Sequence, residues 1–140
     1  MTVSENLRKL VVARAGGACE YCRIVELACG VTFHVEHFVP ESKGGIATLS
    51  NLVLSCPGCN LAKGARTFIV DANGTEQAFF NPREYEPMRL GWHLHFILST
   101  DTGIIVGRTP RGQATVKALN VNSANRLYAR MLQIQIGLLS

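Results

Sequence analysis

Four cysteines occur as two identical pairs, each with two residues between its members. The first pair is Cys19 and Cys22, and the second is Cys56 and Cys59. Four thiolates can close a tetrahedron around one metal ion, and a duplicated C-x-x-C spacing is typical of a structural zinc site. Such a site ties together two distant segments, and the residues between them must fold within that constraint. We therefore predict one structural Zn²⁺ per chain with these four ligands.

Length and composition are those of a globular protein. With 140 residues, the chain is expected to form a single domain over 1–140, and 47% apolar against 17% charged residues excludes a disordered composition. No apolar run is long enough to span a membrane, and the N-terminal residues lack the pattern of a secretory signal. We expect a cytoplasmic location, where reducing conditions keep thiols available to a metal. The fifth cysteine, Cys29, is expected to be a buried or loop thiol.

The net charge gives only weak support for a nucleic-acid partner. The formal charge is +4, but four zinc-bound thiolates and one Zn²⁺ together remove two positive charges, which leaves about +2. The positions of individual Lys and Arg residues therefore matter more than their sum.

Hydrophobic periodicity and turn residues predict an α+β fold. Ser4 is the expected N-cap of a first helix that stops at Gly16-Gly17. The alternation over 31–39 predicts a strand or hairpin, and a short helix is expected over 60–67. After residue 70, the pattern predicts a hairpin over 93–98 and 104–107, then a helix beginning at Thr109-Pro110. A final helix opens at Ser123, with an apolar face formed by Leu127, Met131, Ile134 and Leu138.

Polar residues between and beside the cysteine pairs carry the chemistry of phosphodiester hydrolysis. A neutral imidazole accepts a proton from water near pH 7, which makes His37 the candidate general base. A hard cation such as Mg²⁺ prefers oxygen ligands, which Glu36 and Asn60 can supply. Asn51 is expected to hydrogen bond near the histidine and fix its ring. On a strand, Glu36 and His37 point to opposite faces, so the two roles are compatible if the strand bends.

The motifs around these residues resemble those of the HNH endonuclease family. They run from Phe33 to Pro40, over Gly44-Gly45, from Asn51 to Cys56 and from Cys59 to Gly64. The name-giving positions fall on His37, Asn51 and Asn60, with asparagine in place of the final histidine. Over residues 5–70, the resemblance implies a ββα-metal core with a structural zinc site of four cysteines and a catalytic Mg²⁺ or other divalent cation. It also implies DNA as substrate, with 5′-phosphate and 3′-hydroxyl products.

Residues 71–140 are expected to form a C-terminal extension of a β-hairpin plus two helices. The segments from Phe80 to Arg83, from Trp92 to Phe96 and from Gly107 to Pro110 resemble a tail found on some small bacterial HNH proteins. We expect the extension to pack on the core, and a homodimer interface is the alternative.

We therefore predict a metal-dependent endonuclease that cuts or nicks DNA. The alternatives are a zinc-stabilised nucleic-acid-binding module without cleavage activity and a zinc-dependent protein-interaction domain. Lys63 and Arg66 follow the candidate ligand Asn60 on the same helix and are candidate phosphate contacts, with a solvated helix face as the alternative. Solvent exposure is the simpler expectation for the remaining candidates, which are Arg83, Arg89, Arg108 and Arg111.

Overall fold

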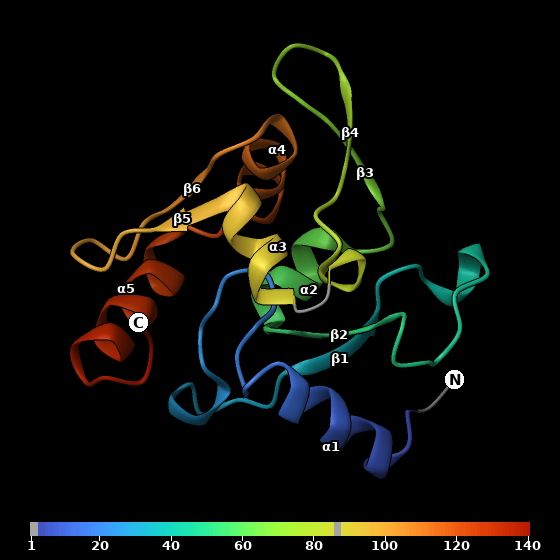
Figure 1. Ribbon diagram of the computed structural model, residues 1–140, viewed down its shortest axis with the longest axis horizontal. Helices are drawn as coiled ribbons and strands as arrows, with labels where there is room; N and C mark the ends of the chain where they lie inside the picture. The colour runs from blue at the N-terminus through green and yellow to red at the C-terminus, as the bar shows by residue number, and fades with distance from the viewer. Residues whose placement is uncertain (1–2, 86–87) are drawn as a thin grey trace.

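The structure is a computed structural model that describes residues 3–85 and 88–140, including their side chains except at 88 and 89. Helices and antiparallel strand pairs make up the described chain, which confirms the predicted α+β class (Figure 1). Within this described part, no helix is both long and apolar enough to cross a membrane.

The N-terminal half places one strand pair between two helices (Figure 1). Helix α1 (Glu5–Arg14) begins at Ser4, whose hydroxyl accepts a hydrogen bond from the Leu7 amide at 3.2 Å. Strands β1 (His34–His37) and β2 (Leu52–Ser55) pair antiparallel, with Glu36 opposite Val53 and His37 opposite Leu52. Helix α1 packs against β2, and α2 (Pro57–Lys63) packs against β1. The result is a ββα unit backed by α1.

Helix α2 begins three residues earlier than 60 and ends before 67, because its ends are set by capping residues. Cys56 is the N-cap, and Pro57 occupies the first helical position, which suits its fixed φ. At the other end, the helix stops at Gly64, whose φ of +55° is not helical. The second cysteine pair therefore lies in the first turn of the helix that carries Asn60.

Short 3₁₀ helices shape the connections in this half of the chain. The first is η1 (Glu26–Ala28), after the first cysteine pair, and the second is η2 (Glu41–Lys43), between β1 and β2. Because η2 begins directly after Pro40, it turns the chain back toward the end of β1.

The C-terminal half contains more elements than the sequence predicted. In chain order they are β3 (Phe68–Val70), β4 (Glu76–Ala78), η3 (Pro82–Glu84), α3 (Met88–His95), β5 (Phe96–Leu98), β6 (Ile105–Gly107), α4 (Pro110–Leu119) and α5 (Ala124–Gln135). The β5–β6 hairpin and the two final helices agree with the prediction. Residues 93–95 do not, because they belong to α3. Trp92 and Phe96 are both buried, at the spacing of a helical turn, and the Trp92 indole donates to the Tyr21 carbonyl at 2.9 Å.

Buried polar contacts join the C-terminal half to the core. Arg83 of η3 forms an ion pair with Glu20, and both side chains are almost fully buried. The Glu20 carboxylate also accepts a hydrogen bond from the Leu54 amide of β2 at 2.8 Å. Burial raises the pKa of Glu20 although Arg83 opposes that shift. One carboxylate therefore links the first cysteine pair, β2 and the extension.

Replacing Glu20 with alanine should lower the free energy of unfolding by about 3–5 kcal/mol, because the Arg83 guanidinium would stay buried without its partner. Urea unfolding measures the loss. Glu5→Ala is the control, because the Glu5 side chain is 84% exposed, and it should change stability by less than about 0.5 kcal/mol. Equal effects of the two substitutions would contradict a structural role for the Glu20–Arg83 pair.

Candidate active site

The four predicted ligands form one buried cluster. Their Sγ atoms all lie within 4.8 Å of one another, and Cys22 Sγ lies 3.6 Å from Cys56 Sγ. All are free thiols. A tetrahedral zinc ion with Zn–S bonds of about 2.3 Å needs S–S separations of about 3.8 Å, so the cluster fits that ion. Cys19, Cys22, Cys56 and Cys59 therefore form a site that can hold a metal ion, and zinc is the ion that four thiolates favour.

The backbone around each pair turns toward the sulfurs. Cys19 Sγ accepts from the Cys22 amide at 3.5 Å, and Cys56 Sγ accepts from the Cys59 amide at 3.4 Å. Cys29 lies apart from the cluster and donates its thiol to the Val25 carbonyl at 3.2 Å, which agrees with the prediction of a loop thiol.

Helix α5 supplies a positive charge to the cluster. Arg126 donates through Nη1 to Cys59 Sγ at 3.0 Å. Arg130, which is fully buried, donates to the carbonyls of Gly103 at 2.6 Å and Val121 at 2.9 Å. Four thiolates around a zinc ion carry a net charge of −2, of which a neighbouring guanidinium offsets one unit. The extension thus contributes an outer layer to the metal site.

The predicted apolar face of the last helix is half-buried at Leu127, Met131 and Ile134, and the fully buried side chains beside it are polar. Arg130 and Gln133 are the buried residues of α5, whereas Leu138 lies beyond the helix and is 39% exposed. Gln133 both donates to the Val25 carbonyl and accepts from the Val25 amide. Polar side chains face the core here because they bond main-chain groups next to the first cysteine pair.

Glu36 has the environment expected of a cation ligand. It is 9% exposed, and its Oε1 atom is buried without a hydrogen-bond partner among the described residues. Burial raises the pKa of Glu36 to about 7, and the nearby Lys63 ammonium opposes that shift. The Lys63 ammonium supplies part of the positive charge that a buried carboxylate needs, and the Oε1 atom without a hydrogen-bond donor is left to bind a cation. The residue therefore fits a divalent cation.

His37 lies on the other face of β1. Its side chain is 12% exposed, and its Nε2 atom lies 3.6 Å from Oε1 of Glu41 in η2. Among the described residues, this nitrogen has no hydrogen-bond partner in the protein. Sequence reasoning did not single out Glu41, because its position beside His37 follows from the turn that η2 makes after Pro40.

Asn51 holds the backbone that follows His37. Its side-chain oxygen accepts from the Val39 amide at 2.9 Å, and its side-chain nitrogen donates to the carbonyls of Val39 at 3.0 Å and Ile46 at 3.1 Å. A side chain at Gly45 would collide with the Val39 carbonyl, so the loop is closely packed. We expected Asn51 to fix the histidine ring, but its side chain fixes the main chain two residues further on.

The prediction that Lys63 contacts phosphate is wrong, because its side chain is fully buried. Its ammonium donates to the Phe38 carbonyl at 2.8 Å. Asn60 lies one turn earlier on α2 and is half-buried. Arg66 lies beyond the helix end, is exposed and donates to the Ala62 carbonyl at 2.7 Å. Of the Lys63 and Arg66 side chains, only that of Arg66 is therefore exposed enough to contact a phosphate group.

The other candidate arginines are held by the protein. Arg83 is buried against Glu20, so the expected exposure of this residue is wrong. Arg111 pairs with Glu84 and donates to the Phe79 carbonyl, and Arg108 donates to the His93 carbonyl at 3.0 Å. The Arg89 side chain lies outside the described residues.

Tyr21 is a residue that sequence reasoning missed. Its hydroxyl is buried without a hydrogen-bond partner in the described structure. Burial and the facing Glu36 carboxylate raise the pKa of Tyr21. The sequence carries no signal for this proximity, since the two residues belong to different segments.

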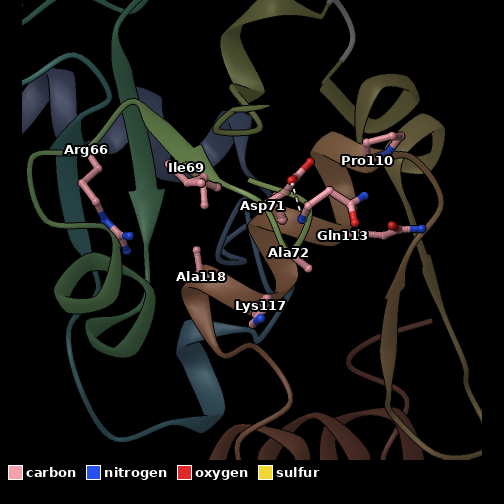
Figure 2. Close-up of a pocket in the computed structure, with 11 residues that line it drawn as sticks. Arg66, Ile69, Asp71, Ala72, Pro110, Gln113, Lys117 and Ala118 are labelled. Carbon is pink, nitrogen blue, oxygen red and sulfur yellow. Dashed lines mark hydrogen bonds between the residues drawn. The ribbon is translucent and has the colours of Figure 1, made fainter. Parts of the chain in front are cut away.

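A cavity of about 450 Å³ lies between the β3–β4 hairpin and α4 (Figure 2). Arg66 and Lys117 supply positive charge to its wall, and Ile69 and Ala118 supply apolar surface. Glu36, His37 and Asn60 are not among its lining residues. The candidate chemistry therefore lies outside this cavity, although the candidate phosphate contact Arg66 is one of its lining residues.

Replacing Arg126 with glutamine should accelerate zinc loss to a coloured chelator by about tenfold, because outer-shell partners contribute 10–100-fold to metal affinity. Arg108→Gln is the matched control, since the Arg108 guanidinium donates to the His93 carbonyl, away from the sulfur cluster, and it should release zinc at the wild-type rate. Identical release from both variants would show that Arg126 does not support the site.

A comparison with protein-family models finds a match to the segment that contains the cysteine cluster and the candidate site residues. Residues 19–66 match the family model described as HNH endonuclease. The match begins at the first cysteine of the cluster and ends at Arg66. No curated protein and no solved structure matches the chain. Residues 19–66 of this chain are therefore similar to the HNH endonuclease domain.

Proposed function

We propose that the protein is a metal-dependent endonuclease that hydrolyses phosphodiester bonds in DNA. The observation that carries this proposal is the unpartnered, buried carboxylate oxygen of Glu36 beside His37, within a segment that matches the HNH endonuclease model. A structural zinc site alone does not account for a buried carboxylate on the neighbouring strand. A binding site for a second cation does.

Glu36 and Asn60 would hold the catalytic cation. The carboxylate comes from β1 and the side-chain carbonyl from α2, and these two elements pack against each other. Both groups are oxygen donors of the kind that Mg²⁺ and Mn²⁺ prefer. When bound, such an ion supplies a Lewis acid for the scissile phosphate and its leaving oxygen.

His37 would accept the proton of the attacking water. Because it follows Glu36 directly on the strand, it approaches the phosphate from a different side than the cation does. Glu41 lies 3.6 Å from its Nε2 atom, where a carboxylate can orient the ring and stabilise the imidazolium that forms. Asn51 contributes by holding the backbone at Val39.

Exposed cations next to this unit would contact the phosphate backbone. Arg66 extends beyond the end of α2, and Lys117 of α4 lies along the wall of the same cavity (Figure 2). Phosphate contacts of this kind position DNA without reading its sequence. For that reason, we do not assign a preferred DNA sequence to the protein. Thiolate metal binding also agrees with a reducing, cytoplasmic location.

A nucleic-acid-binding module without cleavage activity is the alternative. It would use Arg66 and the zinc-stabilised frame, but it would need no general base and no second cation. Incubation of the purified protein with supercoiled plasmid separates the two functions. We expect nicked or linear product with Mg²⁺ or Mn²⁺ and none with EDTA. Binding without cleavage in every metal tried would favour the alternative.

Replacing His37 with alanine should reduce the rate of plasmid cleavage by about 10²–10⁴-fold, the usual contribution of general base catalysis. Zinc content and the circular dichroism spectrum should stay at the wild-type values, because His37 is separate from the cysteine cluster. His34→Ala is the matched control, since His34 begins the same strand and is exposed. Full activity of the His37 variant would overturn the assignment.

A further inference from the structure

We infer that Lys63 is a positioning residue of the hydrolytic site, which holds from α2 the main chain directly after His37. This inference rests on the proposed function, since it concerns the same site. Lys63 has no part in the chemistry described above, and its burial leaves it unable to contact DNA.

The surroundings of Lys63 are unusual for an ammonium group. The side chain is fully buried, and Nζ lies 4.6 Å from the centre of the Phe38 ring and 5.9 Å from that of Phe79. Its hydrogen bond to the Phe38 carbonyl is 2.8 Å long. A buried charge costs free energy, and an apolar side chain of similar size often serves stability as well or better. The nearby Glu36 carboxylate offsets part of this cost, and the hydrogen bond to the Phe38 carbonyl gives the lysine a positional role that an apolar side chain could not fill.

The contact made by Lys63 completes the restraint on one peptide segment. The Phe38 amide donates to the Asn51 carbonyl at 2.8 Å, and the Phe38 carbonyl accepts from Lys63. The next residue, Val39, is held at both its amide and its carbonyl by the Asn51 side chain. The main chain directly after His37 is thus bonded from two directions, from the start of β2 and from α2.

The same contact sets the distance between the two parts of the candidate site. Asn60 precedes Lys63 by three residues on α2, so both side chains project from neighbouring positions of one helix face. Glu36 and His37 lie on the strand whose end Lys63 holds. Loss of this hydrogen bond would let α2 shift against β1. The candidate ligand Asn60 would then move relative to the general base His37. Displacements of about 1 Å can cost about 10²-fold in rate.

Arg66 provides a matched control on the same segment. It lies three residues after Lys63, but it is exposed and borders the cavity of Figure 2. A positioning residue and a phosphate contact affect different quantities. Loss of the first lowers kcat and leaves DNA affinity unchanged, whereas loss of the second weakens DNA affinity and its dependence on salt.

The test compares Lys63→Met, Lys63→Arg and Arg66→Ala in the zinc-loaded, full-length protein. We expect Lys63→Met to lower kcat at saturating plasmid by about 10–100-fold while its Kd for DNA stays at the wild-type value. Lys63→Arg, which keeps a charged donor, should retain more activity than Lys63→Met. Arg66→Ala should weaken DNA binding. It should also reduce by about one the slope of the logarithm of the binding constant against the logarithm of the salt concentration. Unchanged kcat in folded Lys63→Met, or the same loss of DNA affinity as in Arg66→Ala, would overturn the inference.

Hydrogen–deuterium exchange tests the inference independently of cleavage. Amides of the segment 34–40 should exchange faster in Lys63→Met than in the wild type, and those of α5 should be unaffected. If Lys63→Met does not fold, Lys63→Arg serves for the same comparison, with a smaller increase in exchange, because its charged donor is kept but displaced from the Phe38 carbonyl. Absence of cleavage by the wild type would contradict the proposed function, whereas unchanged exchange in 34–40 would contradict the role of Lys63.

Discussion

The sulfur cluster determines where every other part of the site can lie. It joins the segment before β1 to the first turn of α2, because Cys56 caps that helix and Cys59 lies within it. Asn60 follows Cys59 directly, so a metal ion held by the thiolates fixes the start of the helix that carries this candidate ligand. Arg126 connects the same cluster to α5. The zinc site is therefore a frame on which both halves of the chain depend.

Buried charges set the positions of the elements around this frame. Glu20 pairs with Arg83, Lys63 donates to the Phe38 carbonyl, and Arg130 donates to the Cys22 carbonyl in the first cysteine pair. Each contact joins segments that are far apart in sequence. Ionic groups inside a protein cost desolvation energy, and in this chain each of these groups has a partner that fixes one segment against another. Glu36 differs from these groups because one of its oxygens has no partner among the described residues.

Local features of the fold could be predicted because their causes are local. The cysteine spacing predicted the sulfur cluster, the Ser4 hydroxyl caps α1, and Thr109-Pro110 begins α4. The errors concern long cationic side chains and α3. Lys63 and Arg83 are buried by partners such as Phe38 and Glu20, which no pattern around the cations reveals. Helix α3 forms where alternation suggested a strand, because Trp92 is buried through tertiary contacts.

The most direct test of the proposed site is a count of cations that bind in addition to zinc. Titration of the zinc-loaded protein with Mn²⁺, followed by electron paramagnetic resonance, measures this number without DNA. If Glu36 is a ligand, the wild type binds one Mn²⁺ per chain, and Glu36→Gln binds it at least about tenfold more weakly while keeping its zinc. Equal Mn²⁺ binding by the two proteins, or none by the wild type, would contradict the assignment of Glu36 as the ligand of the catalytic metal.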